Sequence, residues 1–95
     1  MYVVELTYLK PLAELDAQLA NHRAFLDTQY AKGLFLASGP KNPRDGGIIL
    51  VSGRLSRDEL GAVLAEDPFQ VNGLASYRVI DFEPVKFAPE LASLL

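Results

Sequence analysis

Two helical patterns, each enclosed between strand patterns, constrain the fold of this chain more than any other feature of its sequence. The first covers residues 11–33, where leucines recur every three or four positions, as on one face of an amphipathic helix. The second covers residues 57–65 and follows the capping-box sequence Ser56-Arg57-Asp58-Glu59. Residues typical of strands precede, separate and follow the helices, at 2–9, 34–38, 47–52 and 75–82.

This β-α-β-β-α-β order is the ferredoxin-like α+β pattern, a four-stranded antiparallel sheet with both helices on one face. In the first strand, alternation places Tyr2, Val4, Leu6 and Tyr8 on the same face. The continuous apolar run at 47–52 indicates a strand buried on both faces. The length of 95 residues suits one domain, which we expect to span residues 1–95.

Helices on one face leave the other face of the sheet uncovered. Because the strands are rich in valine, isoleucine and leucine, that face would be a large apolar patch. We therefore predict a homodimer, which could assemble further into a higher oligomer. The composition, 49% hydrophobic and 22% charged, agrees with a surface partly covered by another subunit. We expect the apolar tail, residues 85–95, to rest on the partner subunit and to contain a short helix at 90–95.

Composition also argues against several classes of function. A net charge of −3 without a basic stripe argues against nucleic-acid binding. The chain has no cysteine and one histidine, so we expect neither a metal site nor a bound cofactor. No apolar run approaches about 18 residues and no signal-peptide pattern opens the chain, so we expect no membrane association and a cytoplasmic location.

The single histidine, His22, lies in the middle of the apolar stripe of the first helix. Its neighbours on that stripe are Leu12, Leu15, Leu19, Leu26 and Tyr30. A polar ring on a core-facing stripe must find a hydrogen-bond partner or lose about 1–3 kcal/mol. The nature of that partner therefore decides what His22 can do.

Four segments together resemble the YciI-like proteins, over a region from Tyr2 to about Pro84. They are His22-Arg23-Ala24-Phe25-Leu26, Ala37-Ser38-Gly39-Pro40, Gly46-Gly47 and Asp67-Pro68-Phe69. The resemblance implies a ferredoxin-like dimeric α+β barrel with His22 and Asp67 as an active-site pair. It also implies that Ser38, Gly39 and Pro40 border the cleft. Some relatives are linked to lyase or dehydrohalogenase chemistry on ring compounds.

On this basis we predict a small enzyme without a cofactor that uses the His22–Asp67 pair on a small metabolite. A carboxylate beside an imidazole selects which ring nitrogen is protonated, and the other nitrogen can then act as a general base. Proton abstraction, isomerisation or elimination suits these residues better than acyl or phosphoryl transfer. Arg44, on the predicted loop at 41–45, is a candidate contact for an anionic ligand.

Two other hypotheses remain open. In the first, the protein is a non-catalytic dimeric module that binds a ligand or another protein, and Asp67 is an N-cap that contributes about 1 kcal/mol. In the second, His22 is an axial ligand of haem, although nothing else in the sequence indicates haem. Tyr8 and Tyr77 are strand aromatics that could line the site, but we assign them to the core or to a dimer contact.

Overall fold

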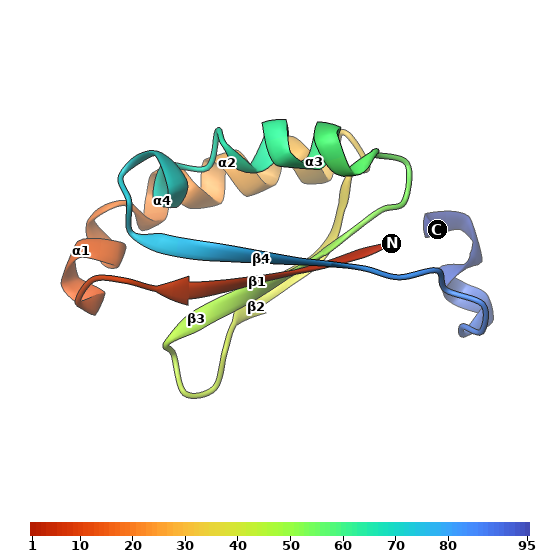
Figure 1. The fold of residues 1–95 in the computed structure, drawn as a ribbon, viewed down its shortest axis with the longest axis horizontal. Helices are drawn as coiled ribbons and strands as arrows, with labels where there is room; N and C mark the ends of the chain where they lie inside the picture. Colours follow the sequence, from red (N-terminus) through yellow and green to blue (C-terminus); the bar gives the residue numbers. More distant parts are fainter.

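One antiparallel sheet forms the base of the structure, a computed structural model that describes residues 1–95 (Figure 1). The spatial order of the strands is β2-β3-β1-β4, and all neighbouring pairs are antiparallel. This is the ferredoxin-like arrangement predicted from the order of elements. The strands are β1 (Tyr2–Tyr8), β2 (Phe35–Pro40), β3 (Gly46–Val51) and β4 (Ala75–Asp81).

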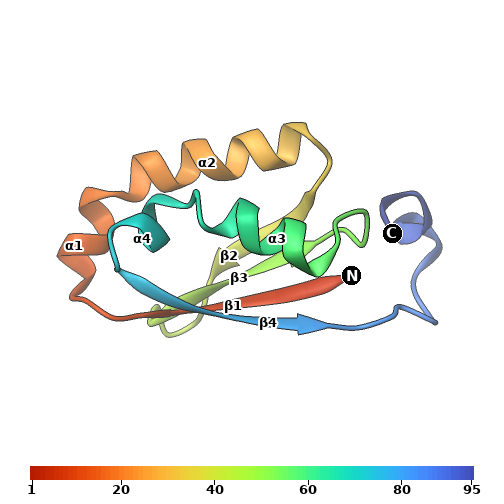
Figure 2. The same ribbon diagram turned by 45° about the horizontal axis from the view of Figure 1, so that its top comes forward.

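Except for the C-terminal one, the helices lie together on one face of this sheet or at its end (Figure 2). Leu15, Leu60 and Leu64 are buried on their inner sides. They meet Tyr2, Val4 and Leu6, which β1 presents on a single face as its alternation predicts. The helical segments are α1 (Leu12–Ala17), α2 (Leu19–Ala31), α3 (Arg57–Leu64), α4 (Pro68–Val71) and the 3-10 helix η1 (Pro89–Leu94).

The prediction of one continuous helix over residues 11–33 is wrong. The chain leaves helical geometry at Gln18, whose φ is −107° and ψ is 4°, and α2 begins at the next residue. The Gln18 N–H donates to the Leu15 carbonyl, a tighter bond than the α-helix uses. Leu15 before the break and Leu19 after it both pack into the core, so the apolar periodicity does not reveal the break.

The two ends of the predicted apolar stripe also differ from the expectation. Leu12 and Tyr30 are exposed, whereas Gln29 is buried in the place that Tyr30 was predicted to take. Tyr30 instead packs its ring edge-on against Phe35. The centre of the stripe is as predicted, since His22 is buried between half-buried Leu19 and Leu26.

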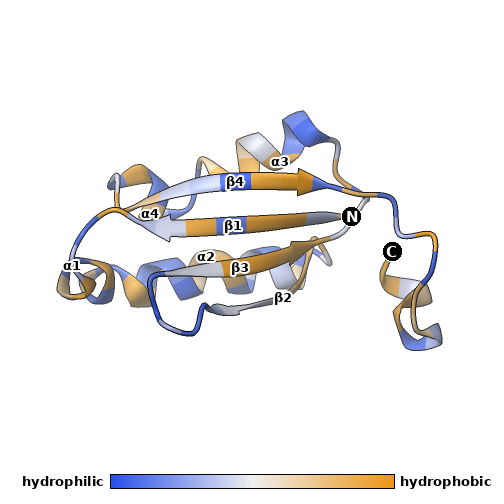
Figure 3. Ribbon diagram, turned by 60° about the horizontal axis from the view of Figure 1, so that its bottom comes forward, coloured by the Kyte–Doolittle hydropathy of each residue, from blue (hydrophilic) through white to orange (hydrophobic).

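The other face of the sheet carries no helix (Figure 3). The strand β3 is therefore not buried on both faces as predicted: Ile49 is buried, while Ile48 and Leu50 are half-buried on the open side. The register aligns an apolar row across the four strands, made of Ala37, Leu50, Val3 and Ile80.

Glycine is required at two positions that shape the sheet and its connections. Gly33 ends α2 with φ of +71°, the left-handed conformation expected of a C-cap glycine. A Cβ on Gly46 would lie 1.9 Å from the Leu6 carbonyl oxygen. The absence of a side chain at Gly46 therefore lets the start of β3 approach β1.

The C-terminal tail lies beyond the end of the sheet near the N-terminus, at the opposite end from α1 (Figure 1). Its helical turn is a 3-10 helix, Pro89–Leu94, close to the short helix predicted at 90–95. Phe87, Leu91 and Leu94 are among its exposed apolar side chains. No helix of the chain has both the length and the apolar character needed to cross a membrane.

The predicted capping box at the start of α3 is present. Ser56 Oγ accepts from the Glu59 N–H at 3.1 Å, and Glu59 Oε1 accepts from the Ser56 N–H at 2.9 Å. These hydrogen bonds, led by the one from the Ser56 backbone, lower the pKa of Glu59 below its usual range. The ionised form of Glu59 is therefore the one that stabilises the helix.

We predict that Glu59→Gln lowers stability at neutral pH but not in acid. A lowered folded-state pKa contributes stability above the unfolded value of about 4.3, and this contribution is lost as pH falls through the folded-state value. Urea denaturation at pH values on both sides of this window measures the difference. Glu66→Gln, at an exposed position after α3 without a side-chain hydrogen bond, is the matched control. An equal difference between wild type and Glu59→Gln at every pH would contradict the prediction.

Candidate functional site

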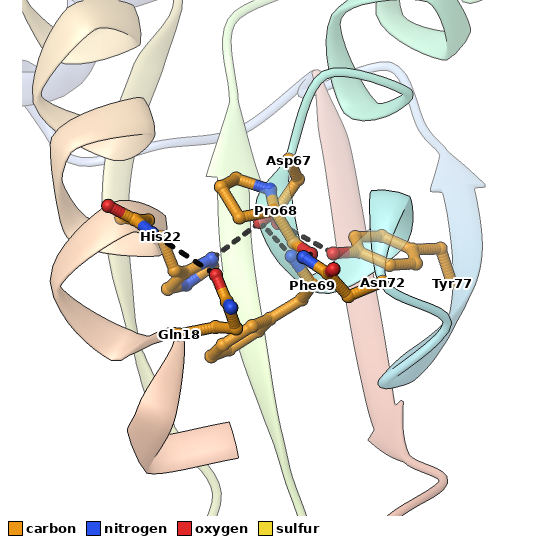
Figure 4. A network of polar contacts seen from close by, with 8 residues as sticks. Gln18, His22, Asp67, Pro68, Phe69, Asn72 and Tyr77 are labelled. Carbon is orange, nitrogen blue, oxygen red and sulfur yellow. Dashed lines mark hydrogen bonds and ion pairs between the residues drawn. The ribbon is translucent and has the colours of Figure 1, made fainter. Parts of the chain in front are cut away.

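A fully buried carboxylate, Asp67, joins three elements behind the candidate site (Figure 4). Its Oδ1 accepts from the Phe69 backbone N–H at 3.0 Å, which is the N-cap bond predicted for α4. Its Oδ2 accepts from the Tyr77 hydroxyl at 2.6 Å, and Oδ1 lies 2.7 Å from Nδ1 of His22. The sequence-predicted pair therefore does meet in the structure.

These contacts determine how the imidazole of His22 is used. Because Asp67 Oδ1 and Oδ2 already accept from Phe69 and Tyr77, a carboxylate there requires Nδ1 of His22 to donate. The other nitrogen, Nε2, has no hydrogen-bond partner in the protein. The ring also stacks on Phe69, with centroids 3.9 Å apart and planes 5° apart. The imidazole is thus held on one edge and one face, with Nε2 left free.

Tyr77 is part of this network, although sequence reasoning assigned it to the core or a dimer contact. Burial raises the pKa of Tyr77 well above its usual value, and the negative charge of Asp67 raises it further. The phenol therefore stays protonated and donates to Asp67. Strand alternation could have indicated this role, since Tyr77 shares the inner face of β4 with Ala75 and pairs with Leu6.

A pocket of about 460 Å³ opens in front of His22, between α2 and the inner face of the sheet. This size is within the range of small-molecule sites. Four other predicted site residues contribute to its wall: Ser38, Gly39, Pro40 and Arg44. Asp67 does not line the pocket, because it lies behind His22 and is not exposed. Asp67 therefore has no direct contact with the pocket, and His22 lies between them.

Two polar contacts hold the rim of this pocket. Ser38 Oγ lies 2.7 Å from the Tyr30 hydroxyl, which links β2 to α2. Arg44 Nη2 donates to Asp16 Oδ1 at 2.6 Å, which links the β2–β3 loop to α1. The hydrogen bond with Asp16 raises the pKa of Arg44, so the guanidinium remains charged. Arg44 also lies over the Tyr8 ring, 6.0 Å from its centroid.

Sequence reasoning missed other residues on the pocket wall. Arg23 was noted only as part of a motif, and Tyr8 was assigned to the core or a dimer contact, yet both line the pocket. Arg23 directly follows His22 on α2, so its place on the helix was the available signal. No three histidine or acidic side chains gather into a metal-binding group.

The sequence profile of the YCII-related domain matches residues 1–83. A similar solved structure is that of TftG, 5-chloro-2-hydroxyhydroquinone dehydrochlorinase of Burkholderia phenoliruptrix, in complex with 2,5-dihydroxybenzoquinone. The two chains are 22% identical with a TM-score of 0.67, and the match covers 87% of this chain and 94% of that one. This likeness is one of fold. No curated protein sequence matches the chain.

We predict that neutral His22 carries its proton on Nδ1, because Asp67 Oδ1 accepts at 2.7 Å. Two-bond proton–nitrogen correlation NMR reads the tautomer directly, and the chain has no other histidine. Asp67→Ser keeps an N-cap oxygen but removes the carboxylate, so the proton should move toward Nε2, as in free histidine. Asp16→Ser, which removes an exposed carboxylate outside the pocket wall, should leave the tautomer unchanged. Protonation of Nε2 in the neutral wild-type ring would overturn the assignment.

Proposed function

The chain belongs to the YCII-related domain family, and on that basis we propose that it is a small enzyme that moves protons on a small metabolite without a cofactor. In this proposal His22 is the general acid and base, and Asp67 positions it. The observation that carries the proposal is the free Nε2 of a buried, oriented imidazole on the wall of a pocket of about 460 Å³.

The environment of His22 supports a catalytic role more than a purely structural one. A histidine that only ties α2 to α4 needs its bond to Asp67, but it has no need to line a pocket. The carboxylate of Asp67 would stabilise the imidazolium that forms when Nε2 takes a proton. The stacked ring of Phe69 keeps that nitrogen at one place in the wall.

The proposed reaction is proton abstraction next to a carbonyl or ring hydroxyl, followed by isomerisation or elimination. Nε2 takes the proton, and the electron pair of the broken bond forms a new double bond. In an elimination the leaving group departs with its own electron pair, and the imidazolium then gives its proton to solvent. The activity in the name of TftG, loss of chloride from a chlorinated hydroquinone, is one reaction of this class and supports testing it.

We predict that His22→Gln loses about 10²–10⁴-fold in rate, the usual contribution of a general base. Two readouts apply: chloride release from 5-chloro-2-hydroxyhydroquinone, and exchange of the acidic C–H proton of a butenolide in deuterated water, followed by NMR. Asp67→Ser should lose less than His22→Gln, since the base remains but is no longer oriented.

Gln18→Ala is the control, because the Gln18 side chain lies near His22 (Figure 4) but accepts a hydrogen bond from Asn21 and does not line the pocket. Its rate should equal that of wild type. Equal rates for wild type and His22→Gln on a substrate that turns over would refute the base assignment. A ligand that binds in a His22-dependent way but is never transformed would favour the alternative function, a non-catalytic binding module.

We also propose that a second copy of the chain covers the open face of the sheet. The apolar row there includes Val3, Leu50 and Ile80, and the next row places Glu5 opposite Arg78. Val3 and Leu50 are half-buried and Ile80 is exposed, and such apolar side chains with few charges are what a sheet-to-sheet contact needs. The exposed apolar tail, residues 85–95, would rest on the same partner.

Light scattering after gel filtration should therefore give about twice the chain mass of 10.4 kDa. Ile80→Asp puts a charge into the proposed contact and should give the monomer. Val71→Asp adds the same charge at a position that is 68% exposed on the helical side, and should leave the dimer intact. A wild-type mass equal to that of one chain would exclude the dimer.

A further inference from the structure

The wall of the pocket beside His22 is cationic, in a chain whose acidic residues outnumber its basic ones by 12 to 9. Its charged lining residues are Arg23 and Arg44, and no acidic residue lines it. Asp67 lies behind the wall with no exposed surface, and three protein donors occupy its oxygens. A ligand in this pocket therefore meets positive charge and hydrogen-bond donors.

Arg23 is a free cation at this wall. It directly follows His22 on α2, its side chain is exposed, and it makes no hydrogen bond or ion pair with the protein. All five of its N–H donors are available, in the planar arrangement that suits two parallel bonds to one carboxylate. No hydrogen bond or ion pair in the fold depends on this side chain, so it is free to contact a ligand in the pocket.

Arg44 approaches the same pocket from the β2–β3 loop. Its bond to Asp16 uses Nη2, and its contact with the Tyr8 ring steadies the guanidinium. A guanidinium has five N–H donors, so the contacts of Arg44 with Asp16 and the Tyr8 hydroxyl leave other donors for a ligand. Arg44 is therefore held in place before a ligand arrives, which reduces the entropy lost on binding.

Apolar side chains make up much of the rest of the wall. Leu6 and Ile49 come from the sheet, Leu19 and Leu26 from α2, and Phe69 from α4. These side chains can enclose a flat apolar body, and the stacked pair of Phe69 and His22 presents an aromatic edge beside it. The pocket thus combines an apolar wall with two cations and one free imidazole nitrogen.

We infer that this pocket takes a small organic anion, an oxyanion such as a carboxylate on an apolar body of about one ring, with Arg23 and Arg44 holding the oxyanion. The inference rests on the proposal that the pocket is the active site, and it specifies the substrate class. Arg23 is the main anchor because its donors are all free. Arg44 is the second contact and remains paired with Asp16.

The test compares benzoate with benzamide, which has nearly the same shape but no charge. Dissociation constants come from NMR titrations that follow the amides of Ser38 and Gly39 on the pocket wall. Benzoate should bind about tenfold or more tightly than benzamide, because charge-assisted bonds are about twice as strong as neutral ones. Arg23→Gln should remove most of this preference, and added salt should weaken the binding of benzoate only.

Arg57→Gln is the matched control, since it makes the same charge change at an exposed position on α3 outside the pocket. It should leave both dissociation constants unchanged. Equal binding of benzoate and benzamide, an unchanged preference in Arg23→Gln, or failure of both probes to bind at millimolar concentration would overturn the inference.

The same titration in His22→Gln separates this inference from the proposed function. Retained preference for benzoate in that variant, together with loss of proton exchange, supports both. If the wild type binds benzoate and benzamide equally but still exchanges the proton, the anion inference alone is overturned. A preference for benzoate in a protein that never exchanges a proton supports the anion site and overturns the enzymatic proposal.

Discussion

The buried carboxylate of Asp67 is the interaction on which the arrangement of this molecule depends most. A carboxylate with no exposed surface is costly unless donors surround it. Here the donors come from α2, from the first turn of α4 and from β4, at 2.7, 3.0 and 2.6 Å. Hydrogen bonds to a charged group each contribute about 1.5–3 kcal/mol. The three hydrogen bonds therefore hold these elements around the carboxylate. The bond from His22 in particular holds α2 in its position over the sheet.

The same constraint separates two parts of the site, the polar network behind His22 and the pocket in front of it. Asp67, which Tyr77 holds in turn, binds Nδ1 of His22, and Phe69 covers one face of the ring, so Nε2 is the ring nitrogen left without a protein partner. In front lies the pocket, whose rim is linked to α1 and α2 by Arg44 and Ser38. Different residues make the polar network behind the ring and the wall of the pocket, so the wall could vary among relatives while the network stays the same.

Sequence reasoning singled out residues of the candidate site where the residue type is rare and overlooked them where it is common. His22 was identified because it is the only histidine, and Asp67 because it precedes Pro68 in a pattern shared with the family. Arg23 and Tyr77 carry no such mark. Arg23 is one of nine basic residues and Tyr77 is one of four tyrosines, so neither stands out until the fold shows that both lie near His22. The break at Gln18 escaped for a related reason, because apolar spacing is the same on both sides of a short interruption.

The sequence by itself determined the order of elements, the capping box of α3, the N-cap of α4 and the glycine that ends α2. All of these depend on residues within a few positions of one another, where backbone geometry leaves little choice. Only the tertiary structure decided that Nδ1 of His22 meets a carboxylate 45 positions away, that Tyr77 supports this carboxylate from the adjoining strand, and that two arginines reach one pocket. Such contacts depend on strand register and on how α2 packs over the sheet, and both are set by the burial of side chains from the whole chain.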